Sequence, residues 1–283
     1  MLIAHDRNEL NIALKQLGAP ARSVGFVATM GALHSGHIAL LEKANTDCDI
    51  SVCTIFVNPT QFNEKGDFDK YPRRVDSDSA LLKDAGCDIL YLPQVDEVYP
   101  PERPRLEDYE DALLFNSYEA VFRPGHFPGV VTVVMRLFEH IRPNKAYFGL
   151  KDYQQYLVVK RATPHFFEAI DVVGVPTIRS KNGLALSSRN FRLNESELED
   201  ALVISHVLRE IASGQGQKPP DEWKDWGMRE MESKGLSPEY LQVCDAENLQ
   251  PVSNWEEANR YVAVCAAFVG EVRLIDNILF EKN

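Results

Sequence analysis

The sequence predicts an α/β protein, in which a parallel β-sheet carries helices on both faces and a smaller α+β domain follows at the C-terminal end. Two observations lead to this fold class. Short apolar runs alternate with helical periodicity in the first two-thirds of the chain, and after Pro176 this alternation stops. The length of 283 residues also suits two domains, because one domain typically holds about 100–200 residues.

The expected elements of the first domain come in strand–helix pairs. Apolar or β-branched runs predict strands at residues 24–28, 50–57, 87–92, 146–148 and 170–175. Helical patterns lie between them, at about residues 36–45, 74–85, 130–141 and 153–161. Strands that are joined through helices run parallel, since parallel neighbours need a long crossover connection. Ligands bind such sheets beyond the carboxyl ends of the strands, so we expect a functional site in the loops at that edge.

The second predicted domain does not continue the strand–helix alternation of the first. Residues 195–213 and 222–234 have helical patterns, and the polar breaker GQGQKPP separates them. Residues 240–243 and 261–269 are typical of strands. We therefore expect the boundary near residue 175, with residues 1–175 in the first domain and residues 176–283 in the second.

Charge and composition restrict the kinds of partner. The formal net charge is −12, whereas a broad nucleic-acid or membrane surface would be rich in Lys and Arg. One nucleotide can still bind a local positive pocket, so nucleotide binding stays open. The five cysteines form no C-x-x-C pair, the first residues show no signal peptide, and no apolar run could span a bilayer. We therefore expect a cytoplasmic protein.

The strongest functional signal is TMGALHSGH at residues 29–37, between the first predicted strand and its helix. Gly31 and Gly36 allow tight turns and a close approach of the backbone to a ligand. A helix start has unpaired N–H groups and the positive end of the helix dipole, which suits phosphate. His34 and His37 lie on one face of this turn, and both can donate hydrogen bonds to phosphate oxygens. We favour phosphate binding over two chance surface histidines or a zinc site, which needs three or four ligands.

This H-x-G-H motif resembles that of the nucleotidyl-transferase superfamily, which includes the class I aminoacyl-tRNA synthetases. Further stretches narrow the resemblance: FVNPTQF at 56–62, FRPGHF at 122–127, FGLKDYQQ at 148–155 and GLALSSRN at 183–190. In this order and at these separations they resemble the pantothenate synthetase family, from about residue 20 to 195, with weaker similarity near residues 273–277. The resemblance implies a Rossmann-like first domain that binds nucleotide and pantoate, and a second domain that covers the active site.

The resemblance also implies a ligase reaction, the ATP-dependent condensation of pantoate with β-alanine to pantothenate. ATP and pantoate would first give pantoyl adenylate and pyrophosphate, and the amine of β-alanine would then displace AMP. The carboxylate of pantoate is itself the nucleophile in this scheme. Catalysis would therefore consist mainly of alignment and of charge neutralisation.

By the same resemblance, the candidate catalytic residues are His34, His37, Lys151 and Arg189. Lys151 would supply a point charge and Arg189 a planar fork for phosphate oxygens. Asp152 is the candidate ligand for Mg²⁺, which would accompany ATP. The full set expected at ATP comprises Met30, Gly31, His34, His37, Gly149, Leu150, Lys151, Asp152, Ile178, Leu186, Ser187, Ser188 and Arg189.

The residues expected at pantoate are Gln61 and Gln155, whose amides both donate and accept, together with Asn58. Other roles stay open: Phe62, Val133 and Val134 form either an apolar wall or ordinary core, and Arg123 and His126 either order a loop or brace the site.

Two positions depart from the family pattern. Ala28 stands where a proline usually precedes the Thr-Met-Gly turn, and Leu150 stands where glutamate is usual. Because we expect the backbone near Leu150 to contact the nucleotide, we expect activity to survive the loss of this carboxylate.

Other functions were weighed against the ligase. One is another adenylyltransferase of the same superfamily that acts on a phosphate acceptor, and a second is a nucleotide-binding module without turnover. A redox enzyme is the least favoured, since the G-x-G-x-x-G fingerprint of dinucleotide-binding proteins does not occur. The expected partners are small molecules, with no nucleic acid and no membrane, and the resemblance implies a homodimer.

Overall fold

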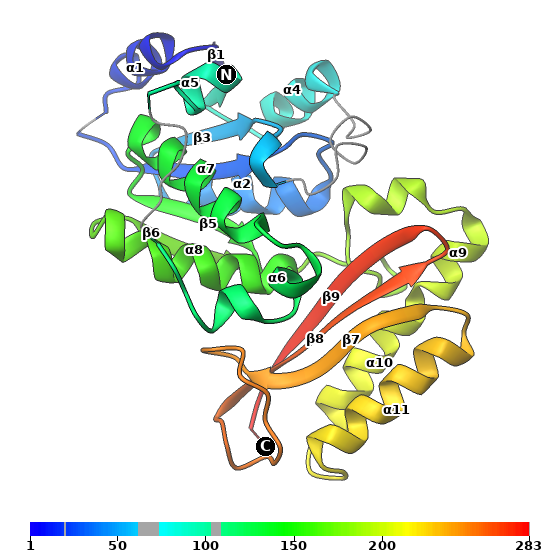
Figure 1. Cartoon of the computed structure of the whole chain (residues 1–283). Helices are drawn as coiled ribbons and strands as arrows, with labels where there is room; N and C mark the ends of the chain where they lie inside the picture. The colour runs from blue at the N-terminus through cyan, green and yellow to red at the C-terminus, as the bar shows by residue number, and fades with distance from the viewer. Residues whose placement is uncertain (20, 62–73, 103–108, 283) are drawn as a thin grey trace. The chain divides into compact units, whose positions relative to one another are not determined.

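The chain divides into two compact units (Figure 1). The N-terminal unit holds Met1–Leu150 and Gln155–Pro176, and the C-terminal unit holds Lys151–Gln154 and Thr177–Asn283. The sequence pattern did not predict that Lys151–Gln154 would group with the C-terminal unit. The structure is a computed structural model, and it describes residues 1–19, 21–61, 74–102 and 109–282.

The N-terminal unit is built on a six-stranded parallel sheet of order β1-β4-β3-β2-β5-β6. The predicted fold class is confirmed, and all of the strands expected in this part of the chain are present. The sequence pattern missed β1, because its three residues are too few to show a period. The strands are β1 (Leu2–Ala4), β2 (Val24–Thr29), β3 (Ile50–Ile55), β4 (Ile89–Tyr91), β5 (Lys145–Gly149) and β6 (Asp171–Val175).

Helices connect these strands, and two of them extend beyond the predicted bounds. One begins at His126 rather than near residue 130, because Pro128 lies in its first turn, where the N–H that proline lacks is not needed. Another continues through Pro164 to Phe166. The helices are α1 (Arg7–Gln16), which was not predicted, α2 (Ser35–Asp47), α4 (Val75–Asp84), α5 (Val95–Val98), α6 (Glu119–Phe122), α7 (His126–Ile141) and α8 (Tyr153–Phe166), with the 3-10 helices η1 (Pro59–Gln61), η2 (Leu114–Asn116) and η3 (Leu150–Asp152).

Helices cover both faces of this sheet, as two adjacent residues of β2 show. The ring of Phe26 meets that of Phe138 on α7, with 6.0 Å between centroids. The next residue, Val27, belongs to a buried cluster with Leu40 and Leu41 of α2. Successive side chains of a strand point to opposite faces, so α7 and α2 lie on opposite sides of the sheet.

The strand order reverses between β2 and β5, which pair directly. From β2 the chain continues to β3 on one side, and from β5 it continues to β6 on the other side. Ligands of open parallel sheets bind at such a reversal, beyond the carboxyl ends of the strands. Residues 30–37 follow β2 and residues 150–152 follow β5, so both of these predicted ATP-binding stretches begin at the expected place.

The C-terminal unit contains a three-stranded antiparallel sheet of order β7-β8-β9, drawn in orange and red in Figure 1. Its buried core includes Leu208 and Ile211 of one helix and Leu241 and Ala263 of the sheet. The stretch expected as one helix at 195–213 is divided at Ala201, and the last strand was not predicted. The elements are η4 (Ser188–Arg192), α9 (Glu195–Asp200), α10 (Leu202–Ser213), α11 (Pro220–Ser233), β7 (Ser237–Asp245), β8 (Arg260–Val269) and β9 (Val272–Glu281).

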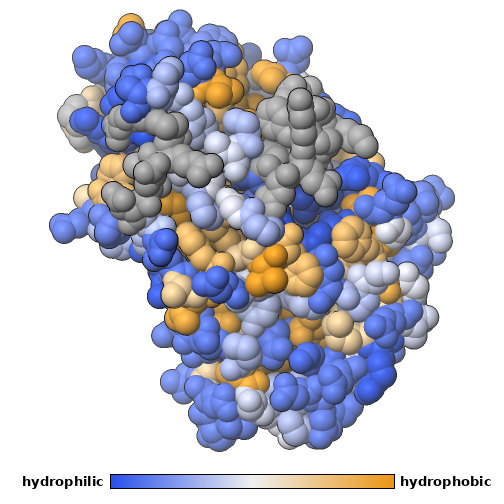
Figure 2. Space-filling view, in the orientation of Figure 1, coloured by the Kyte–Doolittle hydropathy of each residue, from blue (hydrophilic) through white to orange (hydrophobic). Residues whose placement is uncertain are grey.

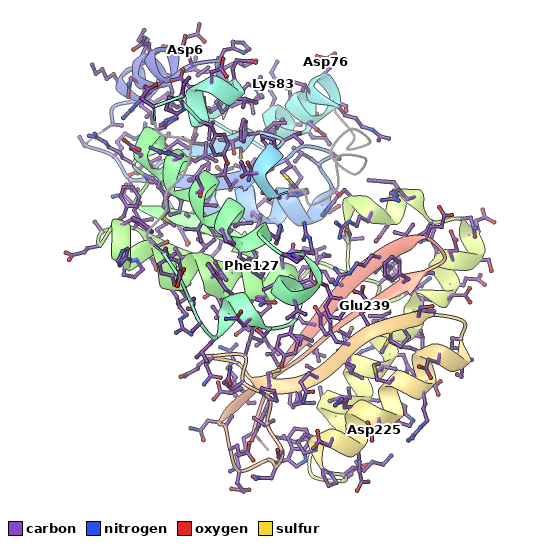
Figure 3. The ribbon with its side chains drawn as sticks, in the orientation of Figure 1. Asp6, Asp76, Lys83, Phe127, Asp225 and Glu239 are labelled. Carbon is purple, nitrogen blue, oxygen red and sulfur yellow. The ribbon has the colours of Figure 1, made fainter. Side chains whose placement is uncertain are left out.

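The face of the protein in Figure 2 is mainly hydrophilic, with hydrophobic side chains in small groups. Acidic and basic residues are placed favourably on α4, where Asp76 lies in the first turn and Lys83 in the last, so that each complements the helix dipole (Figure 3). None of the helices in the described part of the chain is both long and apolar enough to cross a bilayer.

Candidate active site

The loop after β2 forms a tight turn, which is held in place by the carboxylate of a residue on α4. Gly31 and Ala32 both have positive φ, of 86° and 50°. The carboxylate of Asp78 accepts hydrogen bonds from the backbone N–H groups of Ala32 (2.8 Å) and Leu33 (2.9 Å). Asp78 is only 2% exposed, so these bonds lie away from water, where they are strong. The motif predicts the turn but gives no sign of Asp78, which lies 46 residues beyond Ala32.

His34 and His37 cap the start of α2 with their rings. The Nδ1 atom of His34 accepts a hydrogen bond from the Gly36 N–H (3.1 Å), and Nδ1 of His37 accepts one from the His34 N–H (3.3 Å). A backbone N–H can only donate, so neither Nδ1 carries a proton in this arrangement. The proton of each neutral imidazole is therefore on Nε2. Both rings, whose centroids are 4.2 Å apart, are donors at that atom.

Gly36 is required by this packing. A Cβ atom at this position would come within 2.8 Å of Cε1 and 2.9 Å of Nδ1 in the His34 ring. Two imidazole donors and the positive end of α2 thus lie together at one helix start, an arrangement suited to phosphate oxygens. The roles assigned to His34 and His37 stay predictions.

The loop after β3 brings Asn58 and Gln61 together with Met30 of the first loop. The Nδ2 group of Asn58 donates to Oε1 of Gln61 (3.0 Å), and Nε2 of Gln61 donates to Sδ of Met30 (3.0 Å). Nδ1 of His126 donates to the Gln61 carbonyl oxygen (3.0 Å), since a carbonyl only accepts. Of the two roles left open for His126, this contact favours bracing.

The start of α7 packs tightly against η1. A Cβ atom at Gly129 would come within 2.6 Å of the Thr60 carbonyl oxygen, so glycine permits this approach. Val133 and Val134, on the same helix, are 6% and 3% exposed. Phe62, the third residue considered for an apolar wall, lies outside the described residues.

The loop after β5 shows how Leu150 is accommodated in place of the usual glutamate. A Cβ atom at Gly174 of β6 would come within 2.6 Å of Cδ2 of Leu150. The leucine side chain therefore packs over a glycine of the neighbouring strand. Gly149 ends β5, and Gln155 lies in the first turn of α8. The effect of Leu150 on nucleotide affinity stays a prediction.

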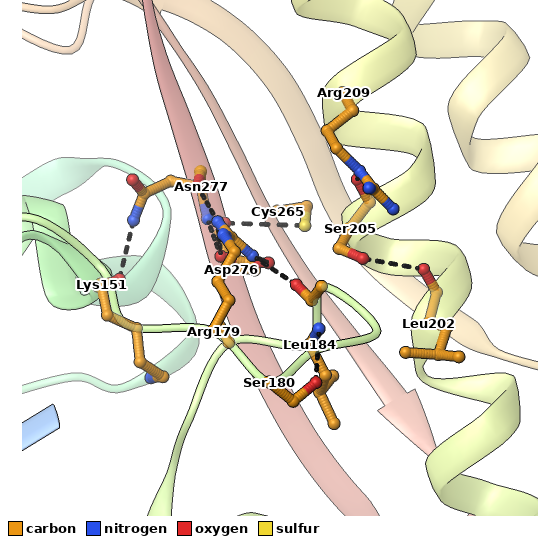
Figure 4. A network of polar contacts seen from close by, with 12 residues as sticks. Lys151, Arg179, Ser180, Leu184, Leu202, Ser205, Arg209, Cys265, Asp276 and Asn277 are labelled. Carbon is orange, nitrogen blue, oxygen red and sulfur yellow. Dashed lines mark hydrogen bonds and ion pairs between the residues drawn. The ribbon is translucent and has the colours of Figure 1, made fainter. Parts of the chain in front are cut away.

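In the C-terminal unit, an ion pair between a partly exposed arginine and a buried aspartate holds the hairpin of residues 178–186 against β9 (Figure 4). Arg179 donates to both carboxylate oxygens of Asp276, at 2.6 and 2.9 Å. It also donates to the carbonyl oxygens of Gly183 (3.1 Å) and Asn277 (2.9 Å). Within the hairpin, the Leu186 N–H donates to the Ile178 carbonyl oxygen (2.9 Å), which brings these two predicted ATP-binding residues side by side.

Lys151 is tied to the same strand. Nδ2 of Asn277 donates to the Lys151 carbonyl oxygen (2.8 Å), as Figure 4 shows. Two residues further on, the Tyr153 hydroxyl donates to the Ala246 carbonyl oxygen (2.7 Å). These two bonds give a physical reason why Lys151–Gln154 belongs to the C-terminal unit.

The predicted serines and arginine follow the hairpin directly. Oγ of Ser187 accepts a hydrogen bond from the Arg189 N–H (3.2 Å) and so caps η4, which begins at Ser188. Lys151, Ser187 and Asp276 are among the residues that line a pocket of about 10 Å³, the room of a single water. The structure therefore brings Lys151 and Ser187 together within this unit.

Among the described residues, no three His, Cys, Asp or Glu side chains gather as a metal centre would require. Asp152, the candidate Mg²⁺ ligand, has a side chain that is 45% exposed. Its Oδ1 atom lies 3.4 Å from Nζ of Lys151. It can offer one carboxylate. Mg²⁺ usually takes one or two carboxylates from a protein and completes its shell with water and phosphates, so this residue fits an ion that arrives with ATP.

Comparison with known proteins agrees with the sequence motifs. The family described as pantoate-beta-alanine ligase matches residues 2–279. The pantothenate synthetase of Bacteroides thetaiotaomicron is 40% identical over 283 residues, which cover 100% of both chains. The pantothenate synthetase of Pseudomonas fluorescens is 41% identical over 272 residues, or 95% of this chain and 94% of the other.

Solved structures that resemble this chain belong to the same family of ligases. The crystal structure of pantothenate synthetase from Thermus thermophilus has a TM-score of 0.90 and 40% identity, covering 98% of this chain and 99% of that one. A pantoate-beta-alanine ligase from Francisella tularensis, complexed with beta-gamma ATP and beta-alanine, has a TM-score of 0.81 and 34% identity. That alignment covers 99% of this chain and 97% of the other.

Proposed function

Because the chain belongs to the pantoate–β-alanine ligase family, we propose that it makes pantothenate from pantoate, β-alanine and ATP. In the first step, a carboxylate oxygen of pantoate attacks the α-phosphorus of ATP, and the bond from that phosphorus to pyrophosphate breaks. In the second step, the amine nitrogen of β-alanine attacks the acyl carbon. AMP leaves with the electron pair of the acyl–oxygen bond, and the nitrogen loses a proton as the amide forms.

One observation carries this proposal: the paired imidazoles and the Gln61 amide lie on loops that follow neighbouring strands. β2 and β3 pair directly, and their loops touch where Nε2 of Gln61 meets Sδ of Met30 at 3.0 Å. An acid held by Gln61 would lie beside a phosphate held at the start of α2. Such alignment of nucleophile and phosphorus is what the first step needs most.

We assign the charge that gathers on the leaving pyrophosphate to four side chains. His34 and His37 would donate from Nε2, Lys151 would supply a point charge, and Arg189 would offer a planar fork. Each donor aimed at developing charge is typically worth about 10²–10³ in rate. The other residues assigned to ATP are Met30, Gly31, Gly149, Leu150, Asp152, Ile178, Leu186, Ser187 and Ser188.

We assign Mg²⁺ to the ATP phosphates, with Asp152 as its ligand from the protein. The ion would neutralise phosphate charge when bound. Asp152→Asn should raise the Mg²⁺ concentration that gives half the maximal rate, because an amide oxygen binds Mg²⁺ more weakly than a carboxylate. An unchanged Mg²⁺ requirement would remove Asp152 from the metal shell.

The decisive experiment adds the substrates in order to purified protein with ATP and Mg²⁺. Pyrophosphate should appear after pantoate alone, and AMP should appear only after β-alanine follows. Pyrophosphate that depends on a phosphate acceptor instead of pantoate would favour the other adenylyltransferase. ATP binding without any pyrophosphate would favour a module that does not turn over.

A homodimer and a cytoplasmic location complete the proposal. The dimer rests on the resemblance to the family, and the location rests on the composition of the sequence. Sedimentation equilibrium at several protein concentrations tests the first. A mass of one chain at all concentrations would remove the dimer from the proposal without touching the reaction.

A further inference from the structure

Tyr99 is linked by hydrogen bonds to Gln61, the residue assigned to pantoate. It directly follows α5, outside all of the sequence motifs. Its hydroxyl donates to Oδ1 of Asn58 (2.6 Å) and lies 2.9 Å from Oγ1 of Thr60. Nδ2 of Asn58 in turn donates to Oε1 of Gln61 (3.0 Å). The chain of contacts thus runs from Tyr99 through Asn58 to Gln61.

Two backbone groups decide which way the Asn58 amide points. Oδ1 of Asn58 faces the Thr60 N–H (3.3 Å), which can only donate. Nδ2 faces the Gly129 carbonyl oxygen (3.3 Å), which can only accept. In the flipped orientation, the NH₂ group would face the Thr60 N–H and the oxygen would face the Gly129 carbonyl oxygen, so neither pair could form a hydrogen bond. The backbone therefore sets which way the Asn58 amide points, and the bond from the Tyr99 hydroxyl, the shortest of the three to Oδ1, restrains the amide in that orientation.

The orientation of the Asn58 amide determines the orientation of the Gln61 amide. Because Nδ2 of Asn58 can only donate, Gln61 has to turn its oxygen toward it. The Nε2 group then lies at the other end of the amide, where it meets Sδ of Met30 at 3.0 Å. Gln61 thus presents a donor toward the loop after β2. A donor is the polarity that suits the acceptor oxygens of a carboxylate.

Asn58 was expected to bind pantoate directly, but its hydrogen-bonding groups are occupied within the protein, so we assign it an indirect role instead. Its oxygen accepts from the Tyr99 hydroxyl, the Thr60 N–H and the Thr60 hydroxyl (3.0 Å), and its two amide hydrogens go to Gln61 and Gly129. It is also only 1% exposed. Burial raises the pKa of Tyr99 to about 12, so its hydroxyl keeps its proton near neutral pH and remains a donor.

We infer that Tyr99 is a positioning residue for the acid substrate: through Asn58, it holds Gln61 with its Nε2–H group presented to the carboxylate. This inference rests on the proposed function, since it takes pantoate as the ligand of Gln61. Tyr99 and Asn58 touch no substrate themselves. A side chain that is already ordered loses less freedom on binding, so the linkage acts on the affinity for the acid.

Tyr99→Phe removes the hydroxyl and keeps the ring. Loss of one neutral hydrogen bond should raise the KM for pantoate about 3–10-fold, while the KM for ATP and kcat change less than about 2-fold. The matched control is Tyr91→Phe, which removes a buried hydroxyl of β4, bonded to Nδ1 of His140 (3.0 Å), from the same unit. The control should leave all three constants unchanged. An unchanged KM for pantoate in Tyr99→Phe would overturn the inference.

A double-mutant cycle separates positioning from general support of the fold. In a Gln61→Ala background, Tyr99→Phe should raise the KM for pantoate no further, because Tyr99 acts through the amide that is already absent. If the two changes multiply, Tyr99 acts independently of Gln61 and the inference fails.

Failure of the proposed function can be told apart from failure of this linkage. A wild-type protein that releases no pyrophosphate with pantoate contradicts the function. The linkage is then decided without turnover, from hydrogen exchange of the Asn58 side-chain amide in protein labelled with ¹⁵N-asparagine. Exchange should speed up in Tyr99→Phe and not in Tyr91→Phe. Equal exchange in both variants would overturn the inference.

Discussion

The two units hold their candidate phosphate-binding residues by different means. In the N-terminal unit, the rings of His34 and His37 are held by backbone N–H groups of the same turn. In the C-terminal unit, the backbone of Lys151 is held by Asn277, which lies 126 residues away in the sequence. A local arrangement depends on a few neighbouring residues, whereas a long-range one depends on the whole unit. Substitutions in the N-terminal arrangement should therefore mainly lower the reaction rate, whereas substitutions in the C-terminal arrangement should mainly lower stability.

The largest effect is expected at the local arrangement. His37→Ala should lower kcat by about 10²–10³, because it removes an imidazole donor assigned to the phosphates. Loss of the cap should cost only about 1 kcal/mol of stability, so the fold should persist. Pyrophosphate release and thermal unfolding measure the two quantities. His37→Asn is the control, since its amide oxygen can still accept the His34 N–H. Near-normal turnover in His37→Asn would show that the cap, not the imidazole, is needed.

The long-range arrangement should respond with a loss of stability. Asp276→Asn leaves Arg179 without the countercharge to which it makes two hydrogen bonds, and because the arginine side chain is 26% exposed the loss should be about 2–3 kcal/mol. Chemical denaturation, followed by tryptophan fluorescence, measures the change. Glu281→Gln is the control, because it breaks a pair with Arg260 whose side chains are 73% and 53% exposed, and it should cost less than about 1 kcal/mol. Equal losses would contradict the role given to Asp276.

Acid should weaken the N-terminal unit through His140. Burial, and then the positive charge of Arg7, lower the pKa of His140 from 6.5 to about 4. The unfolded chain takes up this proton near pH 6.5 and the folded chain does not, so stability is complete above pH 6.5 and falls as the pH drops toward 4. The expected loss is about 1–3 kcal/mol.

Denaturation at pH 7.5, 5.5 and 4.5 measures this loss. His140→Asn can still hydrogen-bond the Tyr91 hydroxyl but does not titrate, so its stability should fall less steeply over this range. A slope equal to that of the wild type would exclude His140 as the cause.

The smallest effect on the reaction rate is expected at Asp78, which bonds the turn after β2 but touches neither histidine ring. Asp78→Asn keeps one acceptor but sets an NH₂ group against a backbone N–H, which should cost about 1–3 kcal/mol and lower kcat a few-fold. Thermal unfolding and pyrophosphate release test this. Asp76→Asn, which neutralises an exposed carboxylate on the same helix, should lower stability by less than about 1 kcal/mol and leave kcat unchanged. Equal behaviour of the two variants would contradict the contact of Asp78 with Ala32 and Leu33.

The fold of the N-terminal unit could be predicted because its strands are short, apolar and separated by amphipathic helices. β1 was missed since three residues carry no period, and its pairing with β4 depends on residues 2–4 meeting residues 89–91. The division of residues 195–213 into α9 and α10 was also missed. β9 was missed although its ten residues pair along most of β8, because it contains Arg273, Asp276 and Asn277, which interrupt the apolar run.

The site could be predicted only where its signal is local. The H-x-G-H motif marks a turn whose caps lie within four residues, so its geometry follows from the sequence. The roles of Asp78, Tyr99 and Asp276 were not predicted, since each bonds a group that is far away in the sequence. The signal that could have found them is a polar residue in an otherwise apolar element, which holds for Asp276 in β9 but not for Tyr99.

The grouping of Lys151–Gln154 with the C-terminal unit has a consequence for dissecting the protein. A cut after Pro176 would leave this tetrapeptide on the N-terminal fragment, away from Asn277 and Ala246, to which it is bonded. Because the chain changes unit after residues 150, 154 and 176, no single cleavage yields two fragments that each keep all their own contacts. A split of the gene after residue 150 would keep Lys151 with Asn277, but it would remove residues 155–176 from the N-terminal unit.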